Sequence, residues 1–280
     1  GAANMVTGLA TAMMDSVPIV CITGQVPRPA IGSDAFQEMD ISGAVIPVTK
    51  HSYLVMDIKD LAKTIKEAFV IARSGRPGPV LVDIPKDLQA EEFDFIYPEE
   101  PILLPGDNPI KNDINAKSLE EAAKLIANAE RPVILAGHGI LLSGASKEVI
   151  ELSEKGDIPL SWTLLGSGAV PASHNLNMGM MGMHGEFAAN NAIQKADLLI
   201  ACGMRFDDRV TGNTKTYSLN SKKIHIEIDP SEINKNVPVD IALVGDLKTV
   251  LRKLLPILDK QSNNKWIDNI SEWRKESQSR

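Results

Sequence analysis

The sequence predicts an α/β protein of two domains, each built on a mainly parallel sheet that is flanked by helices. Three observations lead to this prediction. Apolar runs of strand length alternate with amphipathic helical stretches, and 280 residues exceed the size of one average domain. Residues 91–112 also form an acidic, Pro-rich stretch without periodicity, which is typical of a linker. We therefore expect a first domain over 1–90, a linker over 91–112, a second domain over 113–260 and a helical tail over 261–280.

The first predicted domain contains two apolar runs that are typical of buried strands, with a helix before each of them. The first run leads into a long loop whose Gly and Pro residues exclude regular structure, and such loops are often functional. Asp60 is expected to cap the second helix, and Lys86 follows the second strand at its carboxyl end. In chain order the predicted elements are a helix over 4–14, a strand over 17–23, the loop over 24–40, a helix over 60–72 and a strand over 80–84.

The second predicted domain alternates strand and helix, which is the pattern of a parallel sheet covered on both faces. Ser118 and Glu121 suggest a capping box at its first helix, Gly156 ends another helix, and Asp246 caps the last core helix. The predicted strands are 132–136, 158–162, a run from Leu198, and 223–229. In the tail, a stripe at helical spacing indicates packing, expected to be toward a missing third domain, and not a ligand site; it consists of Trp266, Ile267, Ile270 and Trp273.

Composition limits the partners and the surroundings of the protein. The formal net charge of −7 argues against a nucleic-acid partner and against docking on an anionic membrane. No apolar run approaches the roughly 20 residues that span a bilayer. Cys21 and Cys202 both lie in apolar, strand-like runs, so we expect core residues rather than ligands or a disulfide, which fits a reducing cytoplasm.

The strongest candidate site in the second domain follows the strand at Leu198. This apolar run ends at Gly203 and continues into a loop with Arg205 and Arg209. In open α/β sheets ligands bind beyond the carboxyl ends of the strands, and guanidinium groups bind phosphate oxygens in a bidentate manner. The pattern favours a phosphate or pyrophosphate site, although a solvated charged loop would show a similar distribution of charge.

A second candidate lies at Gly137-His138-Gly139, which follows a predicted strand and precedes a helix. Bare glycine amides can approach a phosphate there, but the motif is not a complete G-x-G-x-x-G and is weak evidence by itself. Asp157 stands near the spacing of a ribose-binding carboxylate but precedes the next strand, so we discount it. Glu227, within the last predicted strand, is a more natural partner for a ribose hydroxyl.

The remaining chemistry-bearing residues are sparse. His184 lies in a loop of Gly and Met residues, whose polarizable side chains suit a flat aromatic ligand, while a lone His is more commonly structural. No cluster of His, Cys, Asp and Glu has the spacing of a metal site. Taken alone, the residues indicate a nucleotide-binding α/β domain joined to half of another α/β domain, and they do not define a reaction.

Several motifs resemble those of the large catalytic subunit of acetohydroxyacid synthase, also called acetolactate synthase, and they occur in the same order along the chain as in that family. In that family a pyrimidine-binding domain precedes a Rossmann-like middle domain that binds FAD, and a third domain follows. The resemblance implies that residues 1–90 are the second half of the pyrimidine-binding domain and that 113–260 are the middle domain. The motifs are GQVPR at 24–28, GSDAFQE at 32–38, GRPGPVLVDIPKD at 75–87, GMHG at 182–185 and RFDDRVTG at 205–212.

The resemblance also implies a reaction. The family uses thiamine diphosphate and Mg2+ to condense pyruvate with a second 2-keto acid, pyruvate or 2-ketobutyrate, with loss of CO2 on the route to the branched-chain amino acids. FAD is bound without net redox change, because thiamine diphosphate carries the difficult chemistry. The implied partners are the 2-keto acids, further copies of the same subunit in a dimer or tetramer, and a small regulatory subunit.

Individual residues are assigned by the same resemblance. Gln37 and Phe36 match residues near the reacting keto acid, and Lys86 matches one at the substrate channel. Pro27, Ala30, Asp208 and Arg209 fall where inhibitors of the family bind. The positions that match FAD contacts are Arg76, Gly137, His138, Gly139, Thr163, Leu164, Met183, His184, Gly203, Arg205, Asp207, Arg209, Glu227 and Asp246.

Two features of the family are not found in this sequence. The catalytic Glu belongs upstream of Gly1, and no G-D-G motif for Mg2+ and the diphosphate follows Gly245-Asp246. We therefore expect a fragment that does not bind thiamine diphosphate productively and is inactive alone. The alternatives are another thiamine diphosphate enzyme, such as a pyruvate oxidase or a catabolic acetolactate synthase without FAD, and a non-catalytic nucleotide-binding module.

Overall fold

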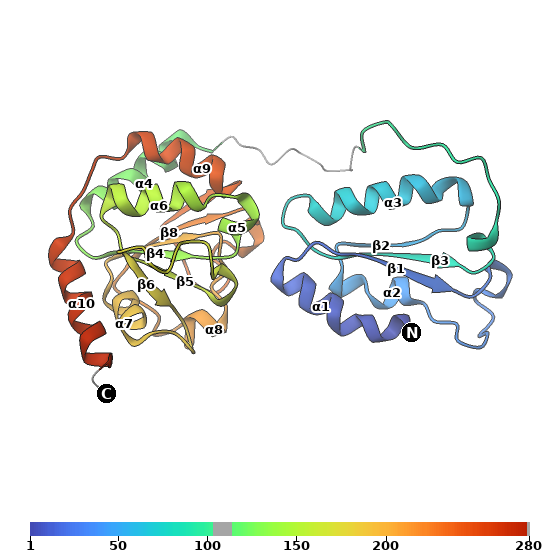
Figure 1. Cartoon of the computed structure of the whole chain (residues 1–280), viewed down its shortest axis with the longest axis horizontal. Coiled ribbons are helices and arrows are strands. Elements are labelled where there is room, and N and C mark those ends of the chain that lie inside the picture. Colours follow the sequence, from blue (N-terminus) through green and yellow to red (C-terminus); the bar gives the residue numbers. More distant parts are fainter. Residues whose placement is uncertain (103–113, 279–280) are drawn as a thin grey trace. The chain divides into compact units, whose positions relative to one another are not determined.

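The structure is a computed structural model that describes residues 1–102 and 114–278. The chain divides into two compact units, Gly1–Asp107 and Asn108–Arg280 (Figure 1). Both units are layered α/β structures with wholly parallel sheets, so the predicted fold class is confirmed. In the described part of the chain, no helix is both long and apolar enough to cross a membrane.

The sheet of the first unit has three parallel strands in the order β1-β3-β2. The central strand is β3 (Val80–Pro85), which is buried along its whole length because strands and helices cover it on every side. It pairs with β1 (Val20–Gln25) and with β2 (His51–Leu54). Helix α3 (Ile58–Arg73) packs on one face, whereas α1 (Met5–Asp15) and the short α2 (Ile41–Ala44) pack on the other (Figure 1).

Three details of the first unit differ from the expectations. Strand β2 was not predicted, because its four residues carry no apolar run. The cap of α3 is Asp57, whose carboxylate accepts the Lys59 amide, and Asp60 lies in the first turn instead. Strand β1 is an edge strand with Ile22 58% exposed, so it is not buried on both faces as expected.

The sheet of the second unit has six parallel strands in the order β6-β5-β4-β7-β8-β9. The two central strands, β4 and β7, are fully buried because helices cover both faces of the sheet. The strands are β4 (Pro132–Ala136), β5 (Leu160–Trp162), β6 (Asn177–Met180), β7 (Leu198–Cys202), β8 (Lys222–Glu227) and β9 (Ile241–Val244).

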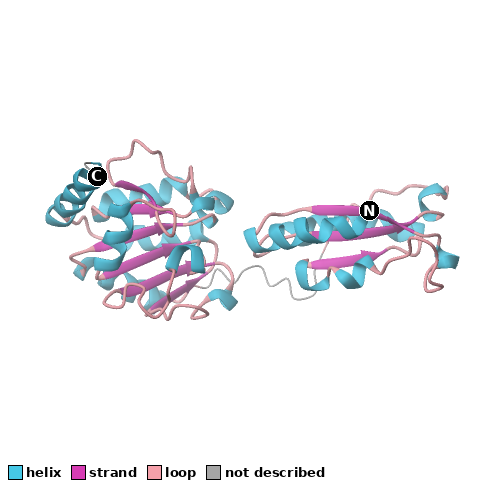
Figure 2. Cartoon of the chain, turned by 90° about the horizontal axis from the view of Figure 1, so that it is seen from below, coloured by secondary structure: helices cyan, strands magenta, loops and turns pink. Residues whose placement is uncertain are grey.

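Two apolar clusters lie on the two faces of this sheet, whose helical layers are visible in Figure 1 and whose parallel strands lie side by side in Figure 2. Alternate residues of the strands point to opposite faces: Ile134 and Ile200 belong to one cluster, Leu135 and Leu199 to the other. The first cluster contains α4 (Ala116–Asn128), α6 (Ser146–Gly156) and α9 (Leu247–Leu254), and the second contains α7 (Phe187–Lys195) and α10 (Asn264–Gln278). Two short helices, α5 (Gly139–Ser143) and α8 (Asp208–Thr211), follow β4 and β7.

The second unit confirms several predicted elements and corrects others. Strand β4 has the predicted bounds, and Asp246 caps α9 through the Thr249 amide. The capping box is wrong, because Asn115 caps α4 three residues earlier than the expected Ser118. Gly156 is the last residue of α6, and the left-handed residue after it is Asp157. The elements β6, α7 and β9 were not predicted.

The tail forms α10 and packs within its own unit. Trp266 and Ile270 are buried against α7, and the Trp266 indole donates to the carbonyl of Pro132 at 3.1 Å. Trp273 contacts Trp266 edge-on, with ring centroids 5.6 Å apart. The stripe therefore packs as predicted, but its partner is α7 of the same unit where we expected a third domain. In the predicted linker, residues 91–102 form no helix or strand, and 103–112 lie outside the described residues.

The corrected cap of α3 leads to a stability prediction. Replacing Asp57 with Ala should lower the free energy of unfolding of the first unit by about 1 kcal/mol, because the Lys59 amide loses its acceptor. Asp60→Ala is the matched control and should cost only about 0.3 kcal/mol, the effect of one charge near a helix terminus. Hydrogen exchange of the α3 amides measures this unit alone, since all three Trp residues lie in the other unit. Equal effects of the two substitutions would contradict the assignment of the cap.

Candidate functional site

The carboxyl ends of the six parallel strands lie at one edge of the second sheet, and the predicted cofactor-binding residues of this unit lie on them. Every strand contributes, because each of the six is followed by one of the predicted positions. These are Gly137, His138 and Gly139 after β4; Thr163 and Leu164 after β5; Met183 and His184 after β6; Gly203, Arg205, Asp207 and Arg209 after β7; Glu227 at the end of β8; and Asp246 after β9. Sequence positions that are 109 residues apart, between 137 and 246, are thus collected at one edge.

Glycines bring the turns after β4 and β7 into direct contact. A Cβ on Gly139 would lie 2.7 Å from the Gly203 Cα, and a Cβ on Gly137 would lie 2.2 Å from the Gly203 carbonyl oxygen. The amides of Gly137 and Gly139 donate to the carbonyls of Cys202 and Gly203 at 3.0 and 2.9 Å. The prediction that these two amides are free for a phosphate is therefore wrong, because they join the two turns to each other.

The loops after β5 and β6 complete this edge. Thr163 donates its amide to Ala136 at the end of β4, and its hydroxyl accepts the Gly166 amide. Met183 donates its amide to the Arg209 carbonyl at 2.8 Å, and the Arg209 guanidinium lies 3.4 Å from the Met183 sulfur. The Gly/Met loop and the arginine loop, 26 residues apart in the chain, are therefore neighbours.

The carboxylates at the edge are held by nearby backbone. Asp207 caps α8 by accepting the Arg209 and Val210 amides, and Asp246 caps α9. Glu227 is buried and accepts the amides of Ile228 and Asp229. The discounted Asp157 accepts the Asn263 amide, a structural role. Since backbone amides already engage these carboxylates, their negative charge is partly compensated where a ligand would approach.

Exposed apolar and cationic side chains lie next to each other at this edge. Leu164 is 74% exposed and Met183 is 59% exposed. The side chain of Arg209 is 71% exposed, and Arg205 is half-buried on the same loop. Large exposed apolar side chains beside guanidinium groups suit a ligand with both a flat apolar part and an anionic part. A nucleotide has this composition.

His225, which the sequence analysis did not select, binds the start of the loop after β7 from the neighbouring strand β8. It is completely buried in β8, and its Nε2 donates to the Met204 carbonyl at 2.8 Å. Burial lowers the pKa of this imidazole, because the cost of desolvating its charged form outweighs the opposing effects of the Met204 carbonyl and the Glu232 carboxylate. Burial likewise raises the pKa of the Cys202 thiol to about 12, which fits the core role expected for this residue. The alternation of polar and apolar residues in β8 would place His225 on an exposed face, so no local pattern indicated its complete burial.

The first unit places Phe36, Gln37 and Lys86 on loops beyond the carboxyl ends of β1 and β3. Phe36 is 89% exposed, Gln37 has a left-handed backbone with φ of 64°, and the exposed Lys86 donates its amide to the Gln25 carbonyl at 3.0 Å. Pro27 and Ala30 belong to the same loop after β1. Arg76, a predicted FAD contact, also lies in this unit, where it donates to Ser16 and Met14. Its assignment to the same ligand as the second-unit residues stays a prediction.

A buried polar network that was not predicted supports this loop. Asp83, 1% exposed in β3, accepts the Thr23 hydroxyl at 2.7 Å and the Gln25 side-chain amide at 2.8 Å. The same Gln25 amide donates to the Met39 carbonyl at 2.7 Å. Arg28 is bound to Asp87 through its backbone amide at 2.9 Å and its Nε at 2.7 Å. Both ends of the loop are thereby attached to the sheet.

Among the described residues, no group of three or more His, Cys, Asp and Glu side chains could hold a metal ion. The two cysteines are free and buried, far apart in sequence, in β1 and β7.

Comparison with known proteins agrees with this architecture. Residues 119–254 match the family described as the thiamine pyrophosphate enzyme, central domain, and residues 1–44 match the thiamine pyrophosphate enzyme, N-terminal TPP binding domain. A probable acetolactate synthase large subunit of Methanocaldococcus jannaschii is 49% identical over 280 residues, covering 98% of this chain and 47% of the relative. The acetolactate synthase large subunit of Corynebacterium glutamicum is 47% identical over 98% of this chain and 43% of its own length. An acetolactate synthase of Mycobacterium leprae is 50% identical over 92% of the chain and 41% of its own length.

The fold and the family matches define the class: the chain belongs to the thiamine pyrophosphate enzymes. Within that class it is a homologue of acetolactate synthase large subunits over nearly its whole length. The chain spans about half the length of the curated relatives it matches.

The contact between the turns leads to a second prediction. Gly139→Ala should destabilise the second unit by about 1–3 kcal/mol, because its Cβ would lie 2.7 Å from Gly203 and the two turns would have to separate. Gly8→Ala is the control, because a Cβ at this position of helix α1 would meet no atom within 4 Å outside the local helix backbone, and it should stabilise the first unit by roughly 0.5–1 kcal/mol. Urea unfolding of the second unit is followed by Trp fluorescence and that of the first by amide exchange. No loss of stability with Gly139→Ala would show that the turns tolerate separation.

The buried His225 leads to a pH prediction. Because its pKa in the folded state is below the ordinary value of 6.5, the unfolded chain takes up the proton first as the pH falls. The free energy of unfolding of the second unit should therefore decrease below about pH 6.5 and level off once the folded imidazole also becomes protonated. His225→Gln keeps a side-chain donor for Met204 but does not titrate, so its curve should fall less. Parallel curves for the two proteins would contradict this role of His225.

Proposed function

We propose that this chain forms part of an acetolactate synthase catalytic subunit, which condenses pyruvate with pyruvate or 2-ketobutyrate and releases CO2 in the synthesis of branched-chain amino acids. The observation that carries the proposal is the continuous identity of 45–50% to acetolactate synthases, which extends across both units. It is supported by the positions of the motif residues, which lie beyond the carboxyl ends of strands in each unit.

The cofactor of the second unit in this proposal is FAD. The chemistry of the residues fits it: Arg205 and Arg209 would face the pyrophosphate, Met183 and Leu164 would cover the flat ring, and Glu227 would face a ribose hydroxyl. The turns after β4 and β7 fit as well, because their glycines let the two turns pack closely together beneath the proposed ligand. A Cβ on these glycines would push the two turns apart.

The first unit would orient the keto acids. Thiamine diphosphate, when bound with Mg2+ by the enzyme, supplies the carbanion chemistry of this family. The side chains of the chain itself would then bind and position the substrates. The exposed ammonium of Lys86 can pair with a keto-acid carboxylate, Gln37 offers a hydrogen-bond donor and acceptor, and Phe36 provides an apolar surface that excludes water. Pro27, Ala30, Asp208 and Arg209 are proposed to be the positions where inhibitors bind.

We further propose that the protein works in the cytoplasm as a homo-oligomer together with a regulatory small subunit. The free, buried cysteines support a reducing compartment. The relatives are named as large subunits, and that name supports the presence of a smaller partner.

The decisive experiment is FAD binding to the purified chain, measured by quenching of flavin fluorescence and by retention of flavin on desalting. Saturable binding is expected, and Arg205→Ala and Arg209→Ala should each weaken it by at least about tenfold, the effect of losing a charge-assisted contact to phosphate. Arg131→Ala removes the same charge at the amino end of β4, on the opposite edge of the sheet, and should leave the dissociation constant unchanged.

The alternatives give different results in this experiment. Absence of flavin binding by well-folded chain would leave two explanations: FAD needs contacts from a partner subunit or from other parts of the enzyme, or the relatives without FAD are the better match. Equal binding by the three arginine variants would contradict the placement of the pyrophosphate after β7. Preference for another dinucleotide over FAD would support a nucleotide-binding module of a different kind.

A further inference from the structure

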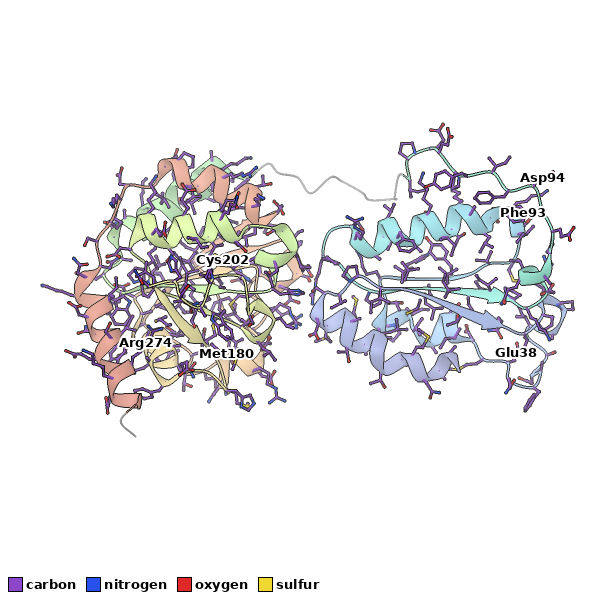
Figure 3. The ribbon with its side chains drawn as sticks, in the orientation of Figure 1. Glu38, Phe93, Asp94, Met180, Cys202 and Arg274 are labelled. Carbon is purple, nitrogen blue, oxygen red and sulfur yellow. The ribbon has the colours of Figure 1, made fainter. Side chains whose placement is uncertain are left out.

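The loop that carries Phe36 and Gln37 closes around a single carboxylate. Glu38 accepts the backbone amide of Gly32 with one oxygen and the amide of Ala35 with the other, the latter at 3.0 Å. Its own amide donates to the Ala35 carbonyl at 2.9 Å. Glu38 lies at the end of the first unit where β1 and β3 end (Figure 3). One side chain thus joins the start of this loop to its end.

The backbone inside this loop adopts conformations that are unfavourable for ordinary residues. Asp34 and Gln37 have φ angles of 55° and 64°, in the left-handed region, and Gly32 has a φ of 82°. A non-glycine residue occupies that region only when its surroundings hold it there. The Glu38 carboxylate provides this restraint, because its two acceptors fix the amides on either side of Asp34.

The charge of Glu38 is part of the restraint. The amides of Gly32 and Ala35 hold the pKa of this carboxyl below its usual range, because they donate to its ionised form. The exit of the loop is fixed separately, since Gln25 joins the Met39 carbonyl to the buried Asp83 of β3. Between these two attachments, the side chains of Phe36 and Gln37 are exposed to solvent on a closed loop.

We propose that Glu38 is a positioning residue: its carboxylate closes the 32–38 loop and thereby sets the direction in which Phe36 and Gln37 face a 2-keto acid. This inference rests on the proposed function for the identity of the ligand, and on the hydrogen bonds of the loop for the role of Glu38.

The role in the loop is tested by amide hydrogen exchange in the purified chain. Glu38→Gln replaces one acceptor oxygen with an NH2 group that opposes a backbone N–H, so exchange of the Gly32 and Ala35 amides should become faster by about tenfold or more, as expected when a hydrogen bond to an ionised acceptor is lost. Asp34→Asn, the control, makes the same change of charge in the same loop and keeps a residue that tolerates left-handed backbone; its exchange rates should match the wild type. Unchanged exchange in Glu38→Gln overturns the proposal.

Pyruvate is the probe for the functional part, with the side-chain amide of Gln37 observed by NMR. In the wild type and in Asp34→Asn, the chemical shift of the Gln37 amide should change saturably with pyruvate concentration. In Glu38→Gln, the shift at the same pyruvate concentration should be at least about fivefold smaller, at an unchanged melting temperature. If Glu38→Gln lowers the melting temperature, Glu38→Asp is measured instead, because it keeps the charge but reaches only one of the two amides. Faster exchange without any pyruvate response in the wild type would overturn the keto-acid function while leaving the loop restraint in place. A pyruvate response that is unaffected by Glu38→Gln would overturn the positioning role.

Discussion

The arrangement of the second unit depends on the close approach of the turns that follow β4 and β7. Gly139 and Gly203 meet at a distance that leaves no room for a Cβ, and the amides of Gly137 and Gly139 are bound across this contact. Because β4 and β7 are the central strands, this contact holds the middle of the edge at which all six strands end. The loops after β5 and β6 are attached to the same edge through Ala136 and Arg209.

The charge that this edge offers to a ligand results from how its carboxylates are used. Asp207 and Asp246 each cap a helix, and Glu227 binds the backbone that follows its strand. The arginines of the β7 loop are not needed for these caps. Of the two Asp residues in the 205–209 loop, Asp207 is thus engaged, whereas Asp208 is 81% exposed and lies 4.0 Å from the guanidinium of the exposed Arg209, so the loop presents both a cation and a carboxylate to solvent.

In the first unit, the loop beyond the carboxyl ends of the strands is held by side-chain hydrogen bonds, and not by a close contact between glycines. Buried Asp83 binds Thr23 and Gln25, Gln25 reaches Met39, and Asp87 binds Arg28. These contacts attach a long irregular loop to a sheet of only three strands. Glu38 then binds the backbone amides of the part of the loop that no strand residue contacts. The exposed Phe36 and Gln37 therefore lie between the Glu38 hydrogen bonds and the attachment of Met39 to the sheet.

The sequence by itself determined the α/β class, the strands at 132–136 and 198–202, and the cap at Asp246, because apolar runs and caps are local patterns. The homology to acetolactate synthases was also accessible from its motifs. Only the tertiary structure decided the strands β2, β6 and β9, which are short and owe their existence to pairing with stronger neighbours. It also decided that Gly137 and Gly139 pack against Gly203 and do not offer free amides, and that Asp83, His225 and Glu38 support the loops. These roles depend on contacts between residues far apart in sequence or on the path of an irregular loop, and local patterns of residue type do not encode such geometry.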